Sequence, residues 1–271
     1  KTNGRKKMKK VGILCTVVCG LLLSAAFGAD PVKLPPKEKF YLVLLAGQSN
    51  MAGRGKIQPE DRAPYPRVLM LNKEGEWVPA AAPIHFDKSF AGIGPGDAFA
   101  KLLAGSDPSI TVGLIPAACG GSSIRHWRPG AYWEQTQSHP YDDAVARTRK
   151  ALESGTLKAI LWHQGEADCN KNADQYARWL TELIRDFRQK FNAPDVPVIV
   201  GQLSQFPGAK WSETRRKVDA AQRKAVEENQ PAAFVTSEGL TSNPDKVHFD
   251  RASQLEFGRR YFEAWRKLIA R

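Results

Sequence analysis

Short, continuous apolar runs alternate with helical patterns along this chain, and that alternation most constrains its fold. Apolar runs without regular polar residues are typical of strands that are buried on both faces of a sheet. They occupy residues 40–46, 111–118, 157–162, 196–203 and 232–235. Strands that alternate with helices form βαβ units, so the pattern predicts a mainly parallel, five-stranded sheet covered by helices on both faces.

The segments between these runs carry apolar residues at helical spacing. The clearest stripe begins at Tyr176 and continues through Trp179, Leu180, Leu183, Ile184, Phe187 and Phe191, as expected of an amphipathic helix. Similar patterns cover residues 141–152, 214–228 and 253–269. No repeat or linker divides the chain after Phe40, which predicts one α/β domain over residues 40–271.

The beginning of the chain has the pattern of a secretory signal peptide. A basic start is followed by an apolar stretch over residues 11–23 and by the small residues Ser24, Ala25 and Ala26. We therefore expect a signal peptide at residues 1–28, with Met8 as a second possible start, and a linker rich in Pro and Lys at residues 29–39. Because the apolar stretch is shorter than the roughly 20 residues that span a bilayer, we expect a secreted or periplasmic protein without stable membrane insertion after cleavage.

Charge and composition exclude several other classes. The chain has 271 residues, of which 42% are hydrophobic, so it can bury a large core. Its net charge is +12, but six Lys or Arg residues precede the first acidic residue, Asp30, so the basic balance does not indicate a nucleic-acid partner. Without the leader only Cys119 and Cys169 remain, and His85, His126 and His139 lack the spacing of metal ligands, so we expect no metal or other cofactor.

Four short polar segments follow the ends of predicted strands or lie in a loop near the C-terminus. They are residues 47–51 (GQSNM), 119–123 (CGGSS), 163–166 (HQGE) and 245–248 (DKVH). Each alone has an ordinary structural explanation, such as a helix cap or a turn. Because functional loops lie beyond the carboxyl ends of parallel strands, we expect the segments to meet at one edge of the sheet.

Together these segments contain the groups that acyl transfer needs. Ser49 is the candidate nucleophile, His248 the base that takes its proton, and Asp245 the acid that orients the imidazole. The reaction also needs hydrogen-bond donors for the oxyanion that forms. The candidates are the backbone N–H groups of Ser49, Gly120 and Gly121 and the side-chain amide of Gln164.

The four segments resemble the four blocks of the SGNH hydrolases, and specifically their sialate O-acetylesterase-like, carbohydrate esterase family 6 branch. The matching stretches are residues 47–54, 120–124, 162–168 and 245–248. This resemblance implies a three-layer α/β/α sandwich with a flavodoxin-like sheet. It also implies metal-independent hydrolysis of O-acetyl esters on a carbohydrate, such as an acetylated xylan-type polysaccharide, an oligosaccharide or sialic acid.

Some assignments stay open at this point. Glu166 is an alternative or shared acid of the triad, although we favour Asp245 because it lies three residues from His248. A general short-chain carboxylesterase is the alternative enzyme, and a non-catalytic sugar-binding domain is the alternative from another class.

We expect five residues to contact the substrate. The expected contacts are Gln48, Asn50, Ser122, Trp127 and Trp133, with buried loop anchors as the alternative for the two tryptophans.

The two cysteines of the predicted domain allow two states. Cys119 and Cys169 can form a disulfide if their Cα atoms lie within about 7 Å. Otherwise they are buried free thiols.

Overall fold

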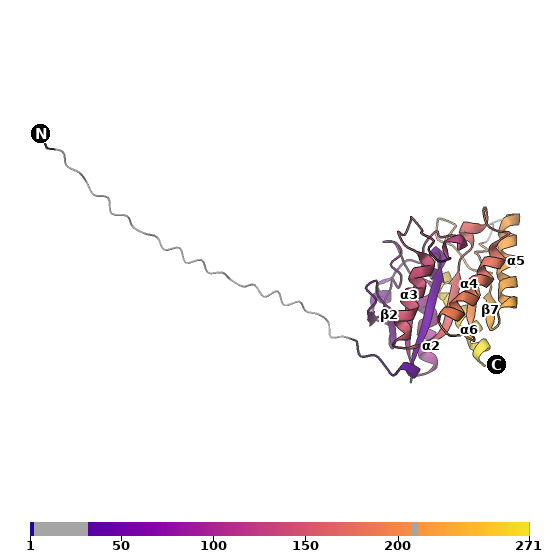
Figure 1. Ribbon diagram of the computed structural model, residues 1–271, viewed down its shortest axis with the longest axis horizontal. Coiled ribbons are helices and arrows are strands. Elements are labelled where there is room, and N and C mark those ends of the chain that lie inside the picture. Colours follow the sequence, from indigo (N-terminus) through magenta and orange to yellow (C-terminus); the bar gives the residue numbers. More distant parts are fainter. Residues whose placement is uncertain (3–31, 207–210, 271) are drawn as a thin grey trace. The chain divides into compact units, whose positions relative to one another are not determined.

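The computed structural model describes residues 1–2, 32–206 and 211–270, and its centre is a seven-stranded sheet (Figure 1). The strands are β1 (Phe40–Gly47), β2 (Val68–Leu71), β3 (Trp77–Pro79), β4 (Thr111–Pro116), β5 (Thr156–His163), β6 (Val198–Gly201) and β7 (Ala232–Val235). Their order in the sheet is β3-β2-β4-β1-β5-β6-β7. Only β3 runs antiparallel to its neighbour.

Six α-helices lie among the described residues, five between strands and the last after β7. They are α1 (Ser49–Ala52), α2 (Pro95–Ser106), α3 (Pro140–Leu152), α4 (Tyr176–Lys190), α5 (Glu213–Glu228) and α6 (Arg251–Ile269). Four short 3₁₀ helices lie at Lys37–Lys39, Pro59–Arg62, Ile124–His126 and Glu166–Asp168. Helix α2, which begins with Pro95 after Gly94, is a long helix that the sequence patterns did not predict.

The predicted fold class is confirmed, but the sheet has two more strands than expected. The five predicted strands lie in the order second, first, third, fourth, fifth, which is the flavodoxin-like arrangement. Strands β2 and β3 extend the sheet beyond β4 as a hairpin. Strand β3 has three residues and is not buried, so it produces no clear hydrophobic pattern. Strand β2 is a mostly buried apolar run of four residues, as short as β7, and the sequence interpretation overlooked it.

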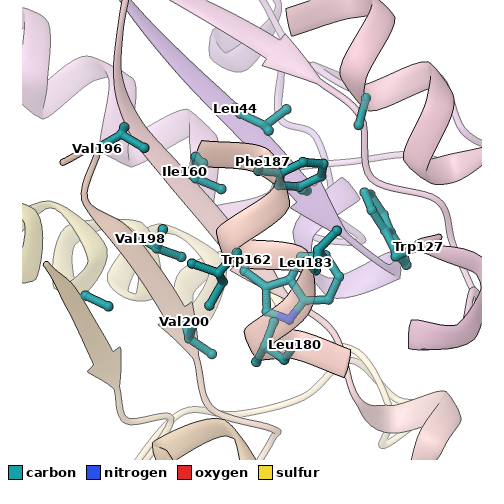
Figure 2. Packing of buried hydrophobic residues seen from close by; sticks show 14 of the residues in the cluster. Leu44, Trp127, Ile160, Trp162, Leu180, Leu183, Phe187, Val196, Val198 and Val200 are labelled. Carbon is teal, nitrogen blue, oxygen red and sulfur yellow. The ribbon is translucent and has the colours of Figure 1, made fainter. Parts of the chain in front are cut away.

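Strand β1 separates two apolar cores because its side chains point alternately to the two faces of the sheet. Leu42, Leu44 and Ala46 belong to the core with α3, α4 and α5 (Figure 2). Val43 and Leu45 belong to the core with α2 and α6. The molecule is therefore the expected three-layer sandwich, with the site's first strand at its centre.

Most of the predicted signal peptide and part of the predicted linker lie outside the described residues. Apart from residues 1 and 2, the predicted signal peptide at 1–28, with its alternative start at Met8, lies outside the described residues, as do residues 29–31 of the linker. In the described part of the linker, Val32 and Leu34 pack against the core that contains Leu42. No helix among the described residues is both long and apolar enough to cross a membrane.

Helices α2 and α6 pack closely at Gly258, where the contact leaves no room for a side chain. A Cβ at Gly258 would lie 2.2 Å from the Pro95 carbonyl oxygen and 2.8 Å from the Ala98 Cβ. We expect Gly258→Ala to lower the free energy of unfolding by about 1–3 kcal/mol, because overpacking pushes the two helices apart. Chemical denaturation measures this change.

Gly105 in α2 provides the matched control, because a Cβ there would meet no atom within 4 Å. Gly105→Ala should leave stability unchanged or raise it by about 0.4–1 kcal/mol. Equal effects of the two substitutions would show that the contact between α2 and α6 tolerates a methyl group.

Candidate active site

The carboxyl ends of β1 and β5 meet at Gly47 and His163, and this contact sets the position of the site. The two residues are paired in the sheet, and a Cβ on Gly47 would lie 2.1 Å from the His163 carbonyl oxygen. Gly47 also has a φ of +134°, which favours glycine. Ser49 follows two residues later as the first residue of α1, at the point where the sheet order changes direction. In doubly wound sheets this switch point is where ligands bind.

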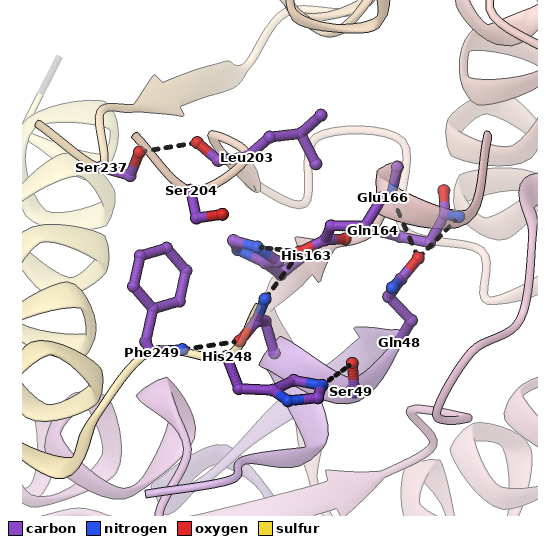
Figure 3. Close-up of polar contacts among 12 residues, drawn as sticks. Gln48, Ser49, His163, Gln164, Glu166, Leu203, Ser204, Ser237, His248 and Phe249 are labelled. Carbon is purple, nitrogen blue, oxygen red and sulfur yellow. Dashed lines mark hydrogen bonds and ion pairs between the residues drawn. The ribbon is translucent and has the colours of Figure 1, made fainter. Parts of the chain in front are cut away.

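Ser49, His248 and Asp245 form a continuous line of hydrogen bonds. His248 Nε2 lies 3.0 Å from Ser49 Oγ, and His248 Nδ1 lies 2.7 Å from Asp245 Oδ2 (Figure 3 shows the Ser49–His248 contact). The other carboxylate oxygen of Asp245 accepts hydrogen bonds from the backbone N–H groups of Val247 and His248, at 2.8 and 2.9 Å. A serine, a base and an orienting acid in this arrangement can generate a nucleophile.

The environment of Asp245 keeps its carboxylate ionised. Partial burial acts to raise the pKa of Asp245, but hydrogen bonds from His248 and Val247 and the charge of His248 outweigh it, so the pKa is lowered. An ionised acid at His248 Nδ1 favours the tautomer in which Nε2 can accept the proton of Ser49.

Two of the backbone N–H groups that the sequence predicts as oxyanion donors are free to take that role. Those of Ser49 and Gly121 have no acceptor among the described residues. Gly121 lies in a turn with a φ of +79°, a conformation that glycine adopts without strain. Backbone donors of this kind stabilise the negative charge that develops on a carbonyl oxygen during acyl transfer.

The comparisons with known proteins agree with this geometry. Residues 39–267 match the family described as "Carbohydrate esterase, sialic acid-specific acetylesterase". The chain belongs to this carbohydrate esterase family. It is therefore a carboxylic ester hydrolase.

Individual relatives cover most of the esterase domain. A probable carbohydrate esterase of Arabidopsis thaliana is 32% identical over 247 residues, which are 83% of this chain and 88% of that protein. A solved structure of an Arabidopsis thaliana protein has a TM-score of 0.73 at 31% identity and covers 86% of this chain and 99% of its own. A carbohydrate acetylesterase from Xanthomonas citri shares the fold, with a TM-score of 0.64 at 20% identity over 85% of this chain and 56% of its own.

Glu166 of this esterase does not lie at His248, where the alternative assignment placed it. Its carboxylate accepts a hydrogen bond from Asn50 Nδ2 at 2.7 Å and lies 3.4 Å from His163 Nε2. Burial acts to raise the pKa of Glu166, but the hydrogen bond and charge of His163 and the Asn50 amide outweigh it and lower the pKa to about 2. The position next to His248 Nδ1 is taken by Asp245.

Gly120 and Gln164 are not placed as oxyanion donors. The Gly120 N–H donates to Asp87 Oδ2 at 2.9 Å. The Gln164 amide is completely buried and donates to Gln48 Oε1 at 3.1 Å, to the Ser122 carbonyl at 3.0 Å and to Asp168. Because these donors already have internal acceptors, they support the loops around the site instead of facing its surface.

Four of the five predicted substrate contacts are also buried. Gln48, Asn50, Ser122 and Trp127 are each at most 4% exposed. Trp127 packs edge-on against Trp162, with ring centroids 5.0 Å apart, and donates to Ser122 Oγ. The structure therefore contradicts a sugar platform at Trp127, and only Trp133 is partly exposed.

The sequence analysis missed an ion pair that fixes the glycine turn. Arg54 Nη2 lies 2.8 Å from Asp87 Oδ2, and both side chains are almost completely buried. The same Asp87 oxygen holds the Gly120 N–H, while Trp133 Nε1 donates to the Gly120 carbonyl at 3.1 Å. Asp87 lies in a loop without a recognisable motif. Of the two residues, only Arg54 belongs to a matching stretch, residues 47–54, so only Arg54 could have been identified from the sequence.

Cys119 and Cys169 are buried free thiols, so the possible disulfide is not formed. Cys119 Sγ contacts Ser138 Oγ at 3.6 Å, whereas Cys169 Sγ contacts the Gly165 carbonyl at 3.3 Å. Burial raises the pKa of both thiols to about 11. Within the described residues no group of three His, Cys, Asp or Glu side chains is arranged to hold a metal ion.

The two carboxylates near the site should respond differently to isosteric substitution. We expect Asp245→Asn to lower kcat by about 10²–10⁴-fold, because an amide at His248 Nδ1 permits the wrong imidazole tautomer. Glu166→Gln should lower kcat only a few-fold, since it retains an acceptor for Asn50. Steady-state kinetics with an aryl acetate measure both effects, and a larger fall for Glu166→Gln would move the triad acid to Glu166.

Proposed function

We propose that this esterase removes O-acetyl groups from carbohydrates by a serine mechanism with an acetyl-enzyme intermediate. The proposal rests on the hydrogen bonds that join Ser49, His248 and Asp245. Ser49 Oγ lies 3.0 Å from His248 Nε2, and His248 Nδ1 lies 2.7 Å from Asp245 Oδ2. A non-catalytic sugar-binding domain would have no need for this arrangement.

In the first half of the reaction, Ser49 is acetylated. His248 Nε2 takes the Ser49 proton while Ser49 Oγ attacks the acetyl carbonyl carbon, and the N–H groups of Ser49 and Gly121 stabilise the oxyanion. The bond between the carbonyl carbon and the sugar oxygen then breaks, and His248 gives its proton to that oxygen. The deacetylated sugar leaves, and the acetyl group remains on Ser49.

In the second half, water replaces the sugar as the reacting group. His248 takes a proton from the water while its oxygen attacks the acetyl carbonyl carbon, and the same N–H groups stabilise the oxyanion. The bond to Ser49 breaks, Ser49 Oγ recovers its proton from His248, and acetate leaves. Asp245 stabilises the imidazolium in both halves.

Aromatic side chains near the glycine turn support a carbohydrate substrate. Phe90 is 64% exposed, and its ring centroid lies 5.1 Å from the Arg54 Cζ. Trp133 Nε1 donates a hydrogen bond to the Gly120 carbonyl. Arg54 and Gly120 both contact Asp87, so each of the two aromatic residues contacts a member of one cluster. Aromatic faces pack well against the C–H surfaces of sugars. The family description and the description of the Arabidopsis relative favour the same substrate class.

Acetate release from acetylated xylan, O-acetylated sialic acid and an aryl acetate tests the proposal. We expect the highest kcat/KM with one of the acetylated carbohydrates, and Ser49→Ala should lower activity on all three substrates by at least about 10³-fold. Trp133→Ala should lower kcat/KM for the preferred carbohydrate by about 3- to 10-fold more than for the aryl acetate.

Other results would assign the protein differently. Preference for the aryl acetate over every sugar ester would make it a general short-chain carboxylesterase. Retained activity of Ser49→Ala would reject Ser49 as the nucleophile. Equal losses on both substrate types for Trp133→Ala would limit Trp133 to supporting the glycine turn.

A further inference from the structure

Asn50 joins the first block of the site to the loop that carries the base. Its side chain is buried directly after the nucleophile and is 1% exposed. Asn50 Nδ2 donates to Glu166 Oε1 at 2.7 Å and lies 3.4 Å from the Val247 carbonyl oxygen. Asn50 Oδ1 accepts the Phe249 N–H at 3.2 Å. One amide therefore contacts the residues on both sides of His248.

Glu166 fixes this amide, and buried groups fix Glu166 in turn. His163 lies at ion-pair distance from Glu166, and its other ring nitrogen lies 3.4 Å from the Tyr261 hydroxyl. That hydroxyl donates to the Trp162 carbonyl at 3.0 Å. This chain of contacts connects Asn50 to β5 and α6, which belong to the packed core.

The loop around His248 needs such an anchor because little of it is buried. Residues 244–247 are exposed, and 49% of Val247 is accessible. Phe249 is buried, and Asn243 gives a second anchor by donating to the Arg54 carbonyl at 2.8 Å. Within the described part of the chain, however, Asn50 is the one residue that hydrogen-bonds to both neighbours of His248 and also adjoins Ser49. A displacement of about 1 Å between reacting groups can cost on the order of 10²-fold in rate.

We propose that Asn50, held by Glu166, is a positioning residue that sets the distance from His248 Nε2 to Ser49 Oγ. It does so through the backbone of Val247 and Phe249 and does not contact the substrate. The inference rests on the proposed serine mechanism but not on the identity of the sugar.

Kinetics of Asn50→Ala test the proposal. We expect kcat to fall by about 10- to 100-fold, equally for an aryl acetate and for an acetylated carbohydrate, with KM within about 2-fold of the wild-type value. The effect is equal because the displaced base serves both substrates. Loss confined to the carbohydrate, with a raised KM, would overturn the proposal and make Asn50 a sugar contact.

Asn229→Ala is the matched control. Asn229 is also a buried asparagine with a fully bonded amide, which contacts Thr181, Ala225 and Arg185 at the end of α5. This variant should lose thermal stability and keep its kcat. If Asn50→Ala behaved in the same way, Asn50 would be merely structural and the proposal would fail.

Variants of Glu166 keep the proposal testable even if Asn50→Ala does not fold. Glu166→Ala should lower kcat nearly as much as Asn50→Ala, whereas Glu166→Gln, which retains an acceptor, should recover most of it. The double variant Asn50→Ala/Glu166→Ala should be no more than about 2-fold worse than Asn50→Ala, because both residues act through one contact. Multiplicative losses, or equal losses for Glu166→Ala and Glu166→Gln, would contradict this link.

The Ser49→Ala variant distinguishes failure of the proposed serine mechanism from failure of the positioning role of Asn50. If Ser49→Ala stays active, the serine mechanism itself is wrong. If Ser49→Ala is inactive while Asn50→Ala and Glu166→Ala keep full kcat, only the positioning role is wrong.

Discussion

The close approach of β1 and β5 at Gly47 is the constraint on which the rest of the site depends. Only a residue without a Cβ lets the Gly47 backbone lie against His163 at the edge of the sheet. This contact puts Ser49 at the end of one central strand and the His163–Glu166 segment at the end of the next. The loop with His248 then contacts Ser49 and Asn50, which follow β1, and Asn50 is hydrogen-bonded to Glu166, which follows β5.

Most polar residues of the four blocks form a buried support for a small reactive surface. Gln164 connects Gln48, Ser122 and Asp168, and Asn50 connects Glu166 to the loop of His248. A buried polar group is costly unless it is hydrogen-bonded, so each network favours one arrangement of its loops. In the proposed mechanism, the motif residues therefore serve the chemistry mainly by holding Ser49, His248 and the Gly121 N–H in place.

The sequence predicted the features that depend on local pattern or on complementary chemistry. Long buried strands such as β1 and β5 have a clear apolar signal, and Asp245 lies close enough in the chain to His248 for their contact to be inferred. The sequence pattern identifies possible donors but not the acceptor that each donor finds. Asp87, far from Gly120 in the sequence, accepts the Gly120 N–H, and Asp168, in the same segment as Gln164, accepts from the Gln164 amide, so neither group stays free for an oxyanion.

Three carboxylates around the site show how environment divides the roles of chemically similar groups. Asp245 is half exposed, and its hydrogen bonds with the His248 loop lower its pKa, so it can stabilise a charge that appears only during the reaction. Glu166 is buried, and its contacts with His163 and Asn50 outweigh the effect of burial and lower its pKa. Asp168 is buried without a cationic partner among its hydrogen bonds, and burial raises its pKa. Of these three carboxylates only Asp245 combines contact with His248 and access to solvent, which favours it as the acid of the proposed triad, while the other two carboxylates hold the structure around it.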